Sequence, residues 1–333
     1  MDIFKSDLKP SLCPNASTEG NRRLLTIGLV QTRWQQDAKI HTDTLHDGIA
    51  QAAHHGAEIV FLPELTLSRY PADTKPTGQA DQTAEPLEGG PTHAFAAAAA
   101  RNNDVFVHAS LFQHCGADDG RGLNTAILVS PRGDIVAATH KLHIPVTAGY
   151  YEDHYFAEGP ATHPYPIHRV ETDSTDLKLG LPTCWDEWFP EVARCYGLGG
   201  AELLCYPTAI GSEPDFPNFD TQPLLQQVIV GHAIANGLFI VVPNRHGAEG
   251  LLNFYGSSFI VDPFGRILVQ APRNSDAVLV AEIDLSQRED WLTLFPFFAT
   301  RRPDTYQSLT HAVVNPRSDT GAGREGSIPG IKV

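Results

Sequence analysis

A strand, a helix and a second strand follow one another within residues 24–62, and this unit constrains the fold more than any other feature. Residues 24–31 (LLTIGLVQ) and 57–62 (AEIVFL) are apolar enough to predict buried strands. Between them, apolar side chains recur at helical spacing from Asp37 until the chain reaches His55 and Gly56. A strand–helix–strand unit of this length joins parallel strands through a right-handed crossover. The sequence therefore predicts an α/β protein.

Further strands and helices follow, but hairpins interrupt their alternation. The turn signal Ser130-Pro131-Arg132-Gly133 joins two successive strands, which is typical of antiparallel pairing. The mixture predicts two mixed sheets covered by helices, in place of one doubly wound sheet. Strands are predicted at 105–112, 124–129, 134–142, 177–183, 201–206, 239–243, 254–262, 266–270 and 277–283, and helices at 92–102, 190–198 and 222–236.

We expect one domain, residues 24–306, between two extensions. Residues 1–23 are predicted to be irregular, because charged residues are scattered through them without the hydrophobic centre of a secretory signal. Residues 307–333 are rich in Gly, Pro, Ser and charge, with too few apolar side chains to pack alone. This tail is expected to be flexible or to pack on a partner subunit.

The balance of charge disfavours several classes of partner. Asp and Glu total 39 against 24 Lys and Arg, which gives a net charge of −15. An acidic protein repels phosphate backbones and anionic membranes, so neither is an expected partner. The longest purely apolar run, Ala94–Ala100, is far shorter than the ~20 residues of a spanning helix. The five cysteines lack the spacing of a disulfide framework, which favours a reducing, cytoplasmic setting.

Three reactive side chains follow apolar strands directly. Glu64 comes after the strand at 57–62, Lys141 ends the strand at 134–142, and Cys184 follows the strand at 177–183. Loops at strand ends are where rigid scaffolds display catalytic groups. If these three ends converge, a thiol, a base and a fixed cation share one pocket, which suffices for nucleophilic attack on a carbonyl carbon bonded to nitrogen.

Each role has a physical requirement. A thiol with a pKa near ~8.5 is mostly protonated at neutral pH, so Cys184 needs a base, and Glu64 would accept its proton. Lys141 would stabilise the thiolate and then the oxyanion of the tetrahedral adduct. Taken singly, each residue also fits a structural role: a buried cysteine packs in a core, and a strand-end glutamate or lysine is solvated or ion-paired.

The local sequences around these residues resemble the nitrilase, or carbon–nitrogen hydrolase, superfamily from about residue 24 to 306. The order Glu, Lys, Cys, with PEL around Glu64, HKLHIP around Lys141 and CWDEWFPE at Cys184, carries the resemblance. Within the superfamily the chain looks most like the N-carbamoylputrescine amidases. The supporting features are Tyr70 and the segments GYYEDHYF (149–156), YPTAIGSEP (206–214), GHAIAN (231–236), PNR (243–245), FYGSSFIVDPFGRI (254–267) and RRPDTY (301–306).

The resemblance implies a role for each residue of the motifs. Cys184 would be the nucleophile, Glu64 the general base and Lys141 the stabiliser of the oxyanion. Glu152 matches a second glutamate that supports the site, and the backbone N–H of Trp185 would complete the oxyanion hole. The implied fold is a four-layer α-β-β-α sandwich that assembles as a homodimer or larger homo-oligomer.

The implied reaction is hydrolysis of an N-carbamoyl amine through a Cys-bound acyl intermediate, with release of amine, CO2 and ammonia. The alternatives are a β-ureidopropionase or other carbamoyl amino acid hydrolase, an aliphatic amidase or nitrilase, and a catalytically silent binding or assembly member of the family. No cofactor is expected. Fifteen histidines include His140 and His143, but no short set of Cys, Asp or Glu ligands accompanies them, so no metal is expected either.

Departures from the family pattern fall on loops that shape the substrate pocket. Pro182 and Thr183 precede the nucleophile, Arg69 stands where proline is common, and Gln227 where arginine is common. Acidic and aromatic residues nearby, among them Glu213, suit a substrate with an ammonium tail, whereas Arg69 would suit a carboxylate. The residues predicted to bind a small-molecule substrate are Arg69, Tyr70, Tyr151, Asp186 and Trp188.

Overall fold

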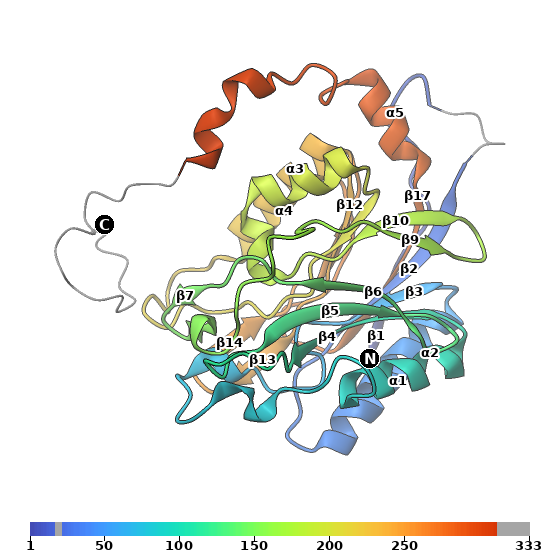
Figure 1. Ribbon diagram of the computed structural model, residues 1–333. Coiled ribbons are helices and arrows are strands. Elements are labelled where there is room, and N and C mark those ends of the chain that lie inside the picture. Colours follow the sequence, from blue (N-terminus) through green and yellow to red (C-terminus); the bar gives the residue numbers. More distant parts are fainter. Residues whose placement is uncertain (17–21, 312–333) are drawn as a thin grey trace.

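Two β-sheets pack face to face, and each is covered on its outer side by a pair of helices (Figure 1). The structure is a computed structural model that describes residues 1–16 and 22–311. In Figure 1, α1 (Ala38–His54) and α2 (Pro91–Asn103) lie at the bottom of the view, and α3 (Pro190–Gly199) and α4 (Gln222–Asn236) lie in its upper part, beside β12. This order of layers confirms the α-β-β-α sandwich expected from the sequence.

The first sheet contains seven strands in the order β1-β17-β2-β3-β4-β5-β6. Its centre is parallel, because β2, β3 and β4 run in one direction and α1 connects β2 to β3. β17 is antiparallel to β2, and β4, β5 and β6 form successive antiparallel pairs. The strands are β1 Asp2–Ser6, β2 Leu24–Gln31, β3 Ile59–Phe61, β4 Phe106–Gln113, β5 Leu123–Val129, β6 Ile135–His140 and β17 Ala277–Asp284.

The second sheet contains six strands in the order β16-β15-β12-β11-β10-β9. Here too the centre, β10 to β12, is parallel and the outer pairs are antiparallel. The strands are β9 His168–Glu171, β10 Asp176–Gly180, β11 Leu203–Cys205, β12 Phe239–Val242, β15 Phe259–Val261 and β16 Ile267–Gln270. Two short antiparallel hairpins stand apart: β7 Val146–Thr147 with β8 Tyr150–Tyr151, and β13 His246–Glu249 with β14 Leu252–Tyr255.

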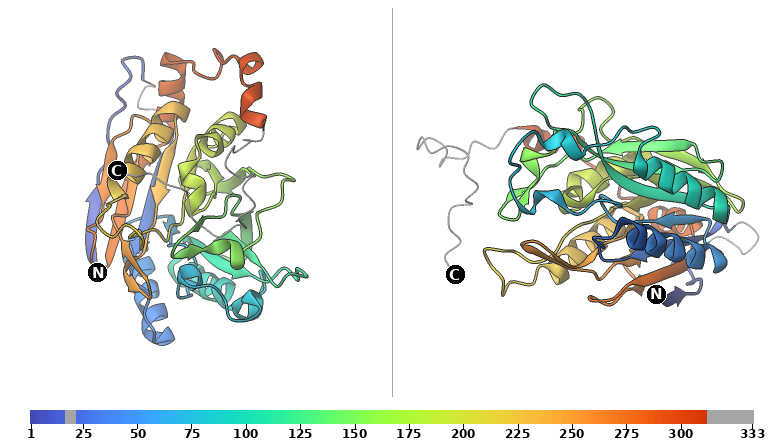
Figure 2. Two further views of the ribbon diagram at one scale, coloured as in Figure 1. Left: turned by 90° about the vertical axis from the view of Figure 1, so that its left-hand side faces the viewer. Right: turned by 90° about the horizontal axis from the view of Figure 1, so that it is seen from below.

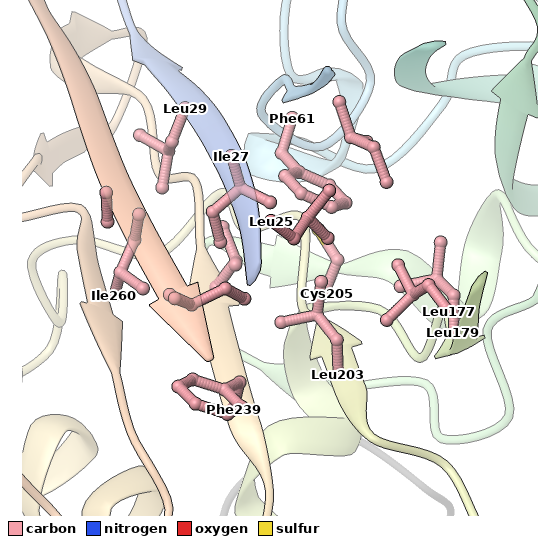
Figure 3. Close-up of a cluster of buried hydrophobic side chains, with 14 of the residues drawn as sticks. Leu25, Ile27, Leu29, Phe61, Leu177, Leu179, Leu203, Cys205, Phe239 and Ile260 are labelled. Atoms are coloured by element: carbon pink, nitrogen blue, oxygen red, sulfur yellow. The ribbon is translucent and has the colours of Figure 1, made fainter. Parts of the chain in front are cut away.

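The main core lies between the two sheets. Figure 3 shows side chains of the first sheet, such as Ile27 and Phe61, facing side chains of the second, such as Leu203 and Phe239. Each of these side chains is buried, and full burial of one large apolar side chain contributes about 1.5–3 kcal/mol. This rigid double layer fixes where the loops after the strands begin.

One glycine allows α1 to lie close against the first sheet. A Cβ atom added at Gly28 would come within 2.7 Å of the Cβ of Ala52 in α1 and 3.1 Å of that of Ala57. The helix itself starts at Asp37, whose side chain accepts hydrogen bonds from the backbone N–H groups of Lys39 and Ile40. The helix predicted from Asp37 to His55 is thus present, and glycine on β2 is required for its packing.

The first residues differ from the prediction. Residues 1–23 were expected to be irregular, but Asp2–Ser6 forms the edge strand β1, paired in parallel with β17 over five residues. Its sequence, DIFKS, carries charges at two of five positions and is mostly exposed. A strand that depends on a distant partner for its hydrogen bonds, and buries little itself, leaves no apolar signal in the sequence.

The C-terminal segment leaves the sandwich at α5 (Ser286–Leu294) and continues through two short 3-10 helices, Pro303–Thr305 and Gln307–Thr310. This segment, red in Figures 1 and 2, arches over one end of the molecule. The remainder of the predicted tail, residues 312–333, lies outside the described residues. Over residues 1–16 and 22–311, no helix is both long and apolar enough to cross a membrane.

Candidate active site

Lys141 joins two buried carboxyl groups at one end of the sandwich. Its Nζ donates to Glu64 Oε1 at 2.9 Å and to Glu152 Oε2 at 2.6 Å, and none of the three side chains is exposed to solvent. Glu64 follows β3, Lys141 follows β6, and Glu152 begins a short 3-10 helix after β8. The structure therefore brings together three residues that the sequence separates by up to 88 positions, Glu64 to Glu152.

Glu152 is the most strongly perturbed carboxyl group of this cluster. Burial raises its pKa to about 7, against the lowering effect of the Lys141 ammonium. Tyr70 donates its hydroxyl proton to Glu152 Oε1 at 2.7 Å, which also favours the ionised form. Tyr70 is itself fully buried, so its hydroxyl holds Glu152 in place from the side opposite Lys141.

Glu64 keeps one oxygen free. Its Oε1 accepts hydrogen bonds from Lys141 and from Asn124 Nδ2, the latter at 2.7 Å, whereas its buried Oε2 has no hydrogen-bond partner among the described residues. A carboxylate oxygen that is buried, fixed in direction and unpartnered is available to take a proton. Asn124 was not singled out from the sequence, since a lone asparagine inside a strand carries no signal of a catalytic contact.

Arg245 holds the backbone that carries Glu64. Its Nη2 donates to the carbonyl oxygens of Glu64 at 2.7 Å and Leu65 at 3.0 Å, while its Nη1 pairs with Glu249. Leu65 has a φ of +48°, a left-handed conformation that such contacts must maintain. Glu249 in turn accepts from the backbone N–H of Tyr70 at 2.8 Å. This buried ion pair was missed, although Arg245 lies in one of the motifs that carried the resemblance.

Cys184 begins the short 3-10 helix Cys184–Trp188 and is 5% exposed. Its φ of +42° is left-handed, which costs a residue with a side chain roughly 1–3 kcal/mol and is common at functional sites. Burial and the nearby Glu64 carboxylate raise the pKa of the thiol, and Lys141 lowers it. The thiol therefore lies within electrostatic reach of both partners predicted for it.

Asp186 accepts hydrogen bonds from both the turn that carries Cys184 and the loop that follows Lys141. Its Oδ2 accepts from the backbone N–H of Thr183 at 3.1 Å, and its Oδ1 accepts from the backbone N–H of His143 at 3.0 Å. The His143 ring lies 2.7 Å from the same oxygen through Nδ1 and stacks on Phe189 with ring centroids 3.8 Å apart. Asp186 was expected to contact substrate. It is instead buried and occupied by these bonds, which join the nucleophile turn to the loop after Lys141.

Arg69 is also occupied. Its guanidinium makes two hydrogen bonds to the Asp73 carboxylate, at 2.9 and 2.6 Å, and a third to the carbonyl oxygen of Tyr70. The expectation that Arg69 binds a substrate carboxylate is therefore not supported by its contacts, because the carboxylate it binds belongs to the protein.

The remaining predicted substrate residues, Tyr151 and Trp188, have different neighbours. Tyr151, in β8, has Lys75 Nζ above its ring at 5.4 Å. Trp185 and Trp188 are half-buried, with ring centroids 6.3 Å apart, and Trp188 packs against the core beneath α3 and α4. Tyr70 faces Glu152, as described above.

Glu213 is a half-buried carboxyl group with no ion pair among the residues that the structure describes. Burial raises its pKa. Its loop is fixed by Tyr150, whose hydroxyl donates to the Ser212 carbonyl oxygen at 3.2 Å and accepts from the Gly211 N–H at 2.9 Å. Tyr150 in turn packs against Tyr70, so the loop of Glu213 borders the cluster around Glu152.

All five cysteines are free thiols, and their exposure differs. Cys115 is exposed, Cys195 is half-buried, and Cys13 and Cys205 are buried. Any alkylation experiment on Cys184 therefore needs Cys115 removed first.

A comparison with protein families identifies the family to which the fold and the sequence belong. The family model described as carbon-nitrogen hydrolase matches residues 26–292, which include Glu64, Lys141, Glu152 and Cys184.

Individual relatives match over most of their length. The chain is 32% identical to a citrullinase of Francisella tularensis, over 86% of this chain and 98% of the relative. It is 33% identical to an N-carbamoylputrescine amidase of Arabidopsis thaliana, over 88% and 97% of the two chains. Among solved structures, a carbon-nitrogen hydrolase from Helicobacter pylori G27 superposes with a TM-score of 0.77 at 32% identity, covering 87% of this chain and all of that one. The sandwich is therefore of the nitrilase type.

The pKa of Glu152 predicts how stability depends on pH. An unfolded chain ionises this carboxyl near 4.5, whereas the folded chain holds the proton to about 7. The free energy of unfolding should therefore fall as the pH rises from about 4.5 to 7, by at most ~1.4 kcal/mol per pH unit. Glu152→Gln should lack this decline in urea titrations, and the exposed Glu158→Gln should retain it. Parallel profiles for wild type and Glu152→Gln would contradict the assignment.

Proposed function

The chain belongs to the carbon–nitrogen hydrolase family, and on that premise we propose that it hydrolyses an N-carbamoyl amine through an acyl intermediate on Cys184. The family and its amidase-named members make the chain a hydrolase of carbon–nitrogen bonds other than peptide bonds. The observation that carries the proposed mechanism is the unpartnered Oε2 of Glu64, whose other oxygen binds Lys141 and whose charge acts on the Cys184 thiol.

In the proposed mechanism, Glu64 Oε2 takes the proton of the Cys184 thiol, and the sulfur attacks the carbonyl carbon of the substrate. The carbonyl oxygen becomes an oxyanion, which the Lys141 ammonium and the backbone N–H of Trp185 stabilise. One lost donor of this kind typically costs about 2.7–4 kcal/mol of barrier. Glu64 then returns its proton to the departing nitrogen, and the C–N bond breaks.

Water completes the proposed reaction. Glu64 takes a proton from the water, the hydroxide attacks the thioester carbonyl carbon, and the C–S bond breaks as the thiol regains a proton. The released carbamic acid decomposes to CO2 and the nitrogen compound that remained bound, so amine, CO2 and ammonia form in either order of departure. Lys141 stays charged throughout, because Glu152 and Glu64 raise its pKa against the effect of burial.

Glu213 supports an ammonium group at the far end of the substrate. It is a carboxyl group without a cation of its own among the described residues, and its charge acts on Tyr150, which packs against Tyr70. A carboxylate beside aromatic rings attracts an alkylammonium by charge and by cation–π contact. Relatives named N-carbamoylputrescine amidase act, by their name, on a ureido compound with such a tail.

A zwitterionic ureido compound such as citrulline is the second candidate. The relative from Francisella is named a citrullinase, and Lys75 supplies a specific observation. Its Nζ lies over Tyr151 with no carboxylate paired to it within the described residues, so it is available to bind a carboxylate near the ammonium site. Arg69 does not serve this purpose because Asp73 occupies it.

We further propose a homo-oligomer in a reducing compartment such as the cytoplasm. Five free thiols support the compartment. Val192 and Tyr196, in the helix α3 after Cys184, offer no surface for an interface, because both are buried in the core of the chain's own second sheet. The support comes instead from the C-terminal segment, where Leu294, Phe295 and Leu309 are exposed by 41%, 45% and 65%.

The substrate assignment is tested by kcat/KM values for four ureido compounds. N-carbamoylputrescine should exceed N-carbamoylbutylamine, which lacks the ammonium, and Glu213→Gln should remove most of that preference, about tenfold or more. Citrulline and N-carbamoyl-β-alanine test whether the site binds a carboxylate. Lys75→Ala should lower kcat/KM for citrulline and leave kcat/KM for N-carbamoyl-β-alanine unchanged. Arg69→Ala is the matched control. A preference for N-carbamoyl-β-alanine that Arg69→Ala abolishes would overturn the ammonium assignment.

The oligomer is tested by light scattering. Wild type should scatter as a dimer or larger, and replacing Phe295 and Leu309 by serine should shift it toward the 36.2 kDa chain. A monomeric wild type at micromolar concentration would contradict the assembly.

A further inference from the structure

Glu187 is a buried carboxyl group that the proposed mechanism does not use. It is the third residue after Cys184 in the helix Cys184–Trp188, and its side chain is fully buried. Its Oε1 has no hydrogen-bond partner, and within residues 1–16 and 22–311 it forms no ion pair. A lone buried carboxylate is unfavourable by several kcal/mol, so its position beside the nucleophile requires an explanation.

The hydroxyl of Thr208 indicates which form of Glu187 is present. Thr208 Oγ1 lies 2.7 Å from the carbonyl oxygen of Tyr206 and 3.2 Å from Glu187 Oε2. A hydroxyl has one proton, and a carbonyl oxygen only accepts. If the shorter contact takes the hydroxyl proton, then the longer contact is a hydrogen bond only when Glu187 carries a proton and donates it to Thr208.

The charges around Glu187 favour the same form. Glu64 and Asp186 are the nearby carboxylates, and Lys141, the nearby cation, already serves Glu64 and Glu152. From α4, the His232 ring donates to the Glu187 carbonyl oxygen at 3.0 Å and stays neutral, because burial lowers its pKa.

The remaining neighbours of the helix Cys184–Trp188 place no compensating charge beside the Glu187 side chain. Tyr206 and Tyr255 are buried phenols whose pKa values burial raises, so they remain neutral. From α3, Glu191 is exposed, and Arg194 lies over the Phe298 ring. No described cation is therefore left to compensate an ionised Glu187, and burial raises the pKa of this carboxyl well above its usual value.

We propose that Glu187 is a positioning residue that remains a neutral acid, donates to Thr208, and thereby keeps a further negative charge away from Cys184. An ionised Glu187 would raise the pKa of the thiol and disfavour both the thiolate and the oxyanion. The neutral acid gives the turn a buried hydrogen bond without that charge. The catalytic consequence rests on the proposed function, whereas the protonation state of Glu187 does not.

The test is the rate at which iodoacetamide alkylates Cys184, followed by mass spectrometry in a Cys115→Ser background from neutral to alkaline pH. Glu187→Gln keeps a donor toward Thr208 and cannot ionise. At neutral pH the alkylation rates of Glu187→Gln and the parent should be nearly equal. At the higher pH at which Glu187 ionises in the parent, the rate of Glu187→Gln should exceed that of the parent, about tenfold for each unit by which the charge raised the thiol pKa. Glu191→Gln, an exposed carboxyl in the next helix, should follow the parent.

Thr208→Val distinguishes the direction of the hydrogen bond. If Glu187 donates, removing the acceptor destabilises its neutral form, so Glu187 ionises at a lower pH. The alkylation rate of the Thr208→Val variant should then fall behind that of Glu187→Gln from a lower pH onward. If Thr208 donates to a carboxylate, the same change raises the pH at which Glu187 ionises and at which the alkylation rate falls behind that of Glu187→Gln. That result would overturn the proposal. A Glu187→Gln rate already about tenfold above the parent at neutral pH would also overturn it.

Alkylation needs no turnover, so these outcomes hold even if none of the ureido compounds is hydrolysed and the proposed function fails. Where turnover is found, the alkaline limb of kcat/KM should move to higher pH in Glu187→Gln. A purely structural role would leave that limb unchanged.

Discussion

The rest of the site depends on one buried cation, Lys141, held between two carboxyl groups. Lys141 has no exposed surface, and a buried ammonium is tolerated only when its charge is compensated. Glu64 and Glu152 compensate it, and each is itself buried, so removal of Lys141 would leave two buried carboxyl groups without a cation. The arrangement fixes Glu64 through its Oε1 and leaves Oε2 without a hydrogen-bond partner among the described residues, while the Glu64 charge acts on the Cys184 thiol. It also holds a positive charge within electrostatic reach of the Cys184 thiol, as the proposed stabilisation of an oxyanion requires.

The scaffold supplies this arrangement because both sheets end at the same place. Glu64 and Lys141 follow strands of the first sheet, Cys184 follows a strand of the second, and the shared core keeps the sheets in register. Two further buried carboxylates then secure the loops. Asp186 ties the turn of Cys184 to the loop of Lys141, and Glu249 with Arg245 ties the loop of Glu64 to Tyr70. Positions near the nucleophile are thus held by charge and hydrogen bonds where no strand continues.

The sequence predicted the parts that leave a periodic or motif signal. Most strands of both sheets, the helices that cover them, and the positions of Glu64, Lys141 and Cys184 at strand ends follow from apolar spacing, whereas β1 and β9 were not predicted. The hydrogen-bond partners of polar side chains cannot be predicted from apolar spacing. Asn124, Arg245 and Glu249 contact the site from distant parts of the chain. Asp186 was predicted to bind substrate, although its carboxylate accepts hydrogen bonds from backbone N–H groups. Edge strands such as β1 are missed by sequence analysis for the same reason, since their hydrogen bonds come from residues far along the chain.

The central claim, that Cys184 is the nucleophile, is tested most directly by turnover of the Cys184→Ala variant on the compound that the wild type hydrolyses best. Its circular dichroism and urea unfolding should establish that the variant is folded, and Cys195→Ala, a half-buried thiol in the next helix, is the matched control. The account predicts that Cys184→Ala loses at least about a thousandfold in kcat while the control retains it. A folded Cys184→Ala that keeps a comparable kcat would contradict the account.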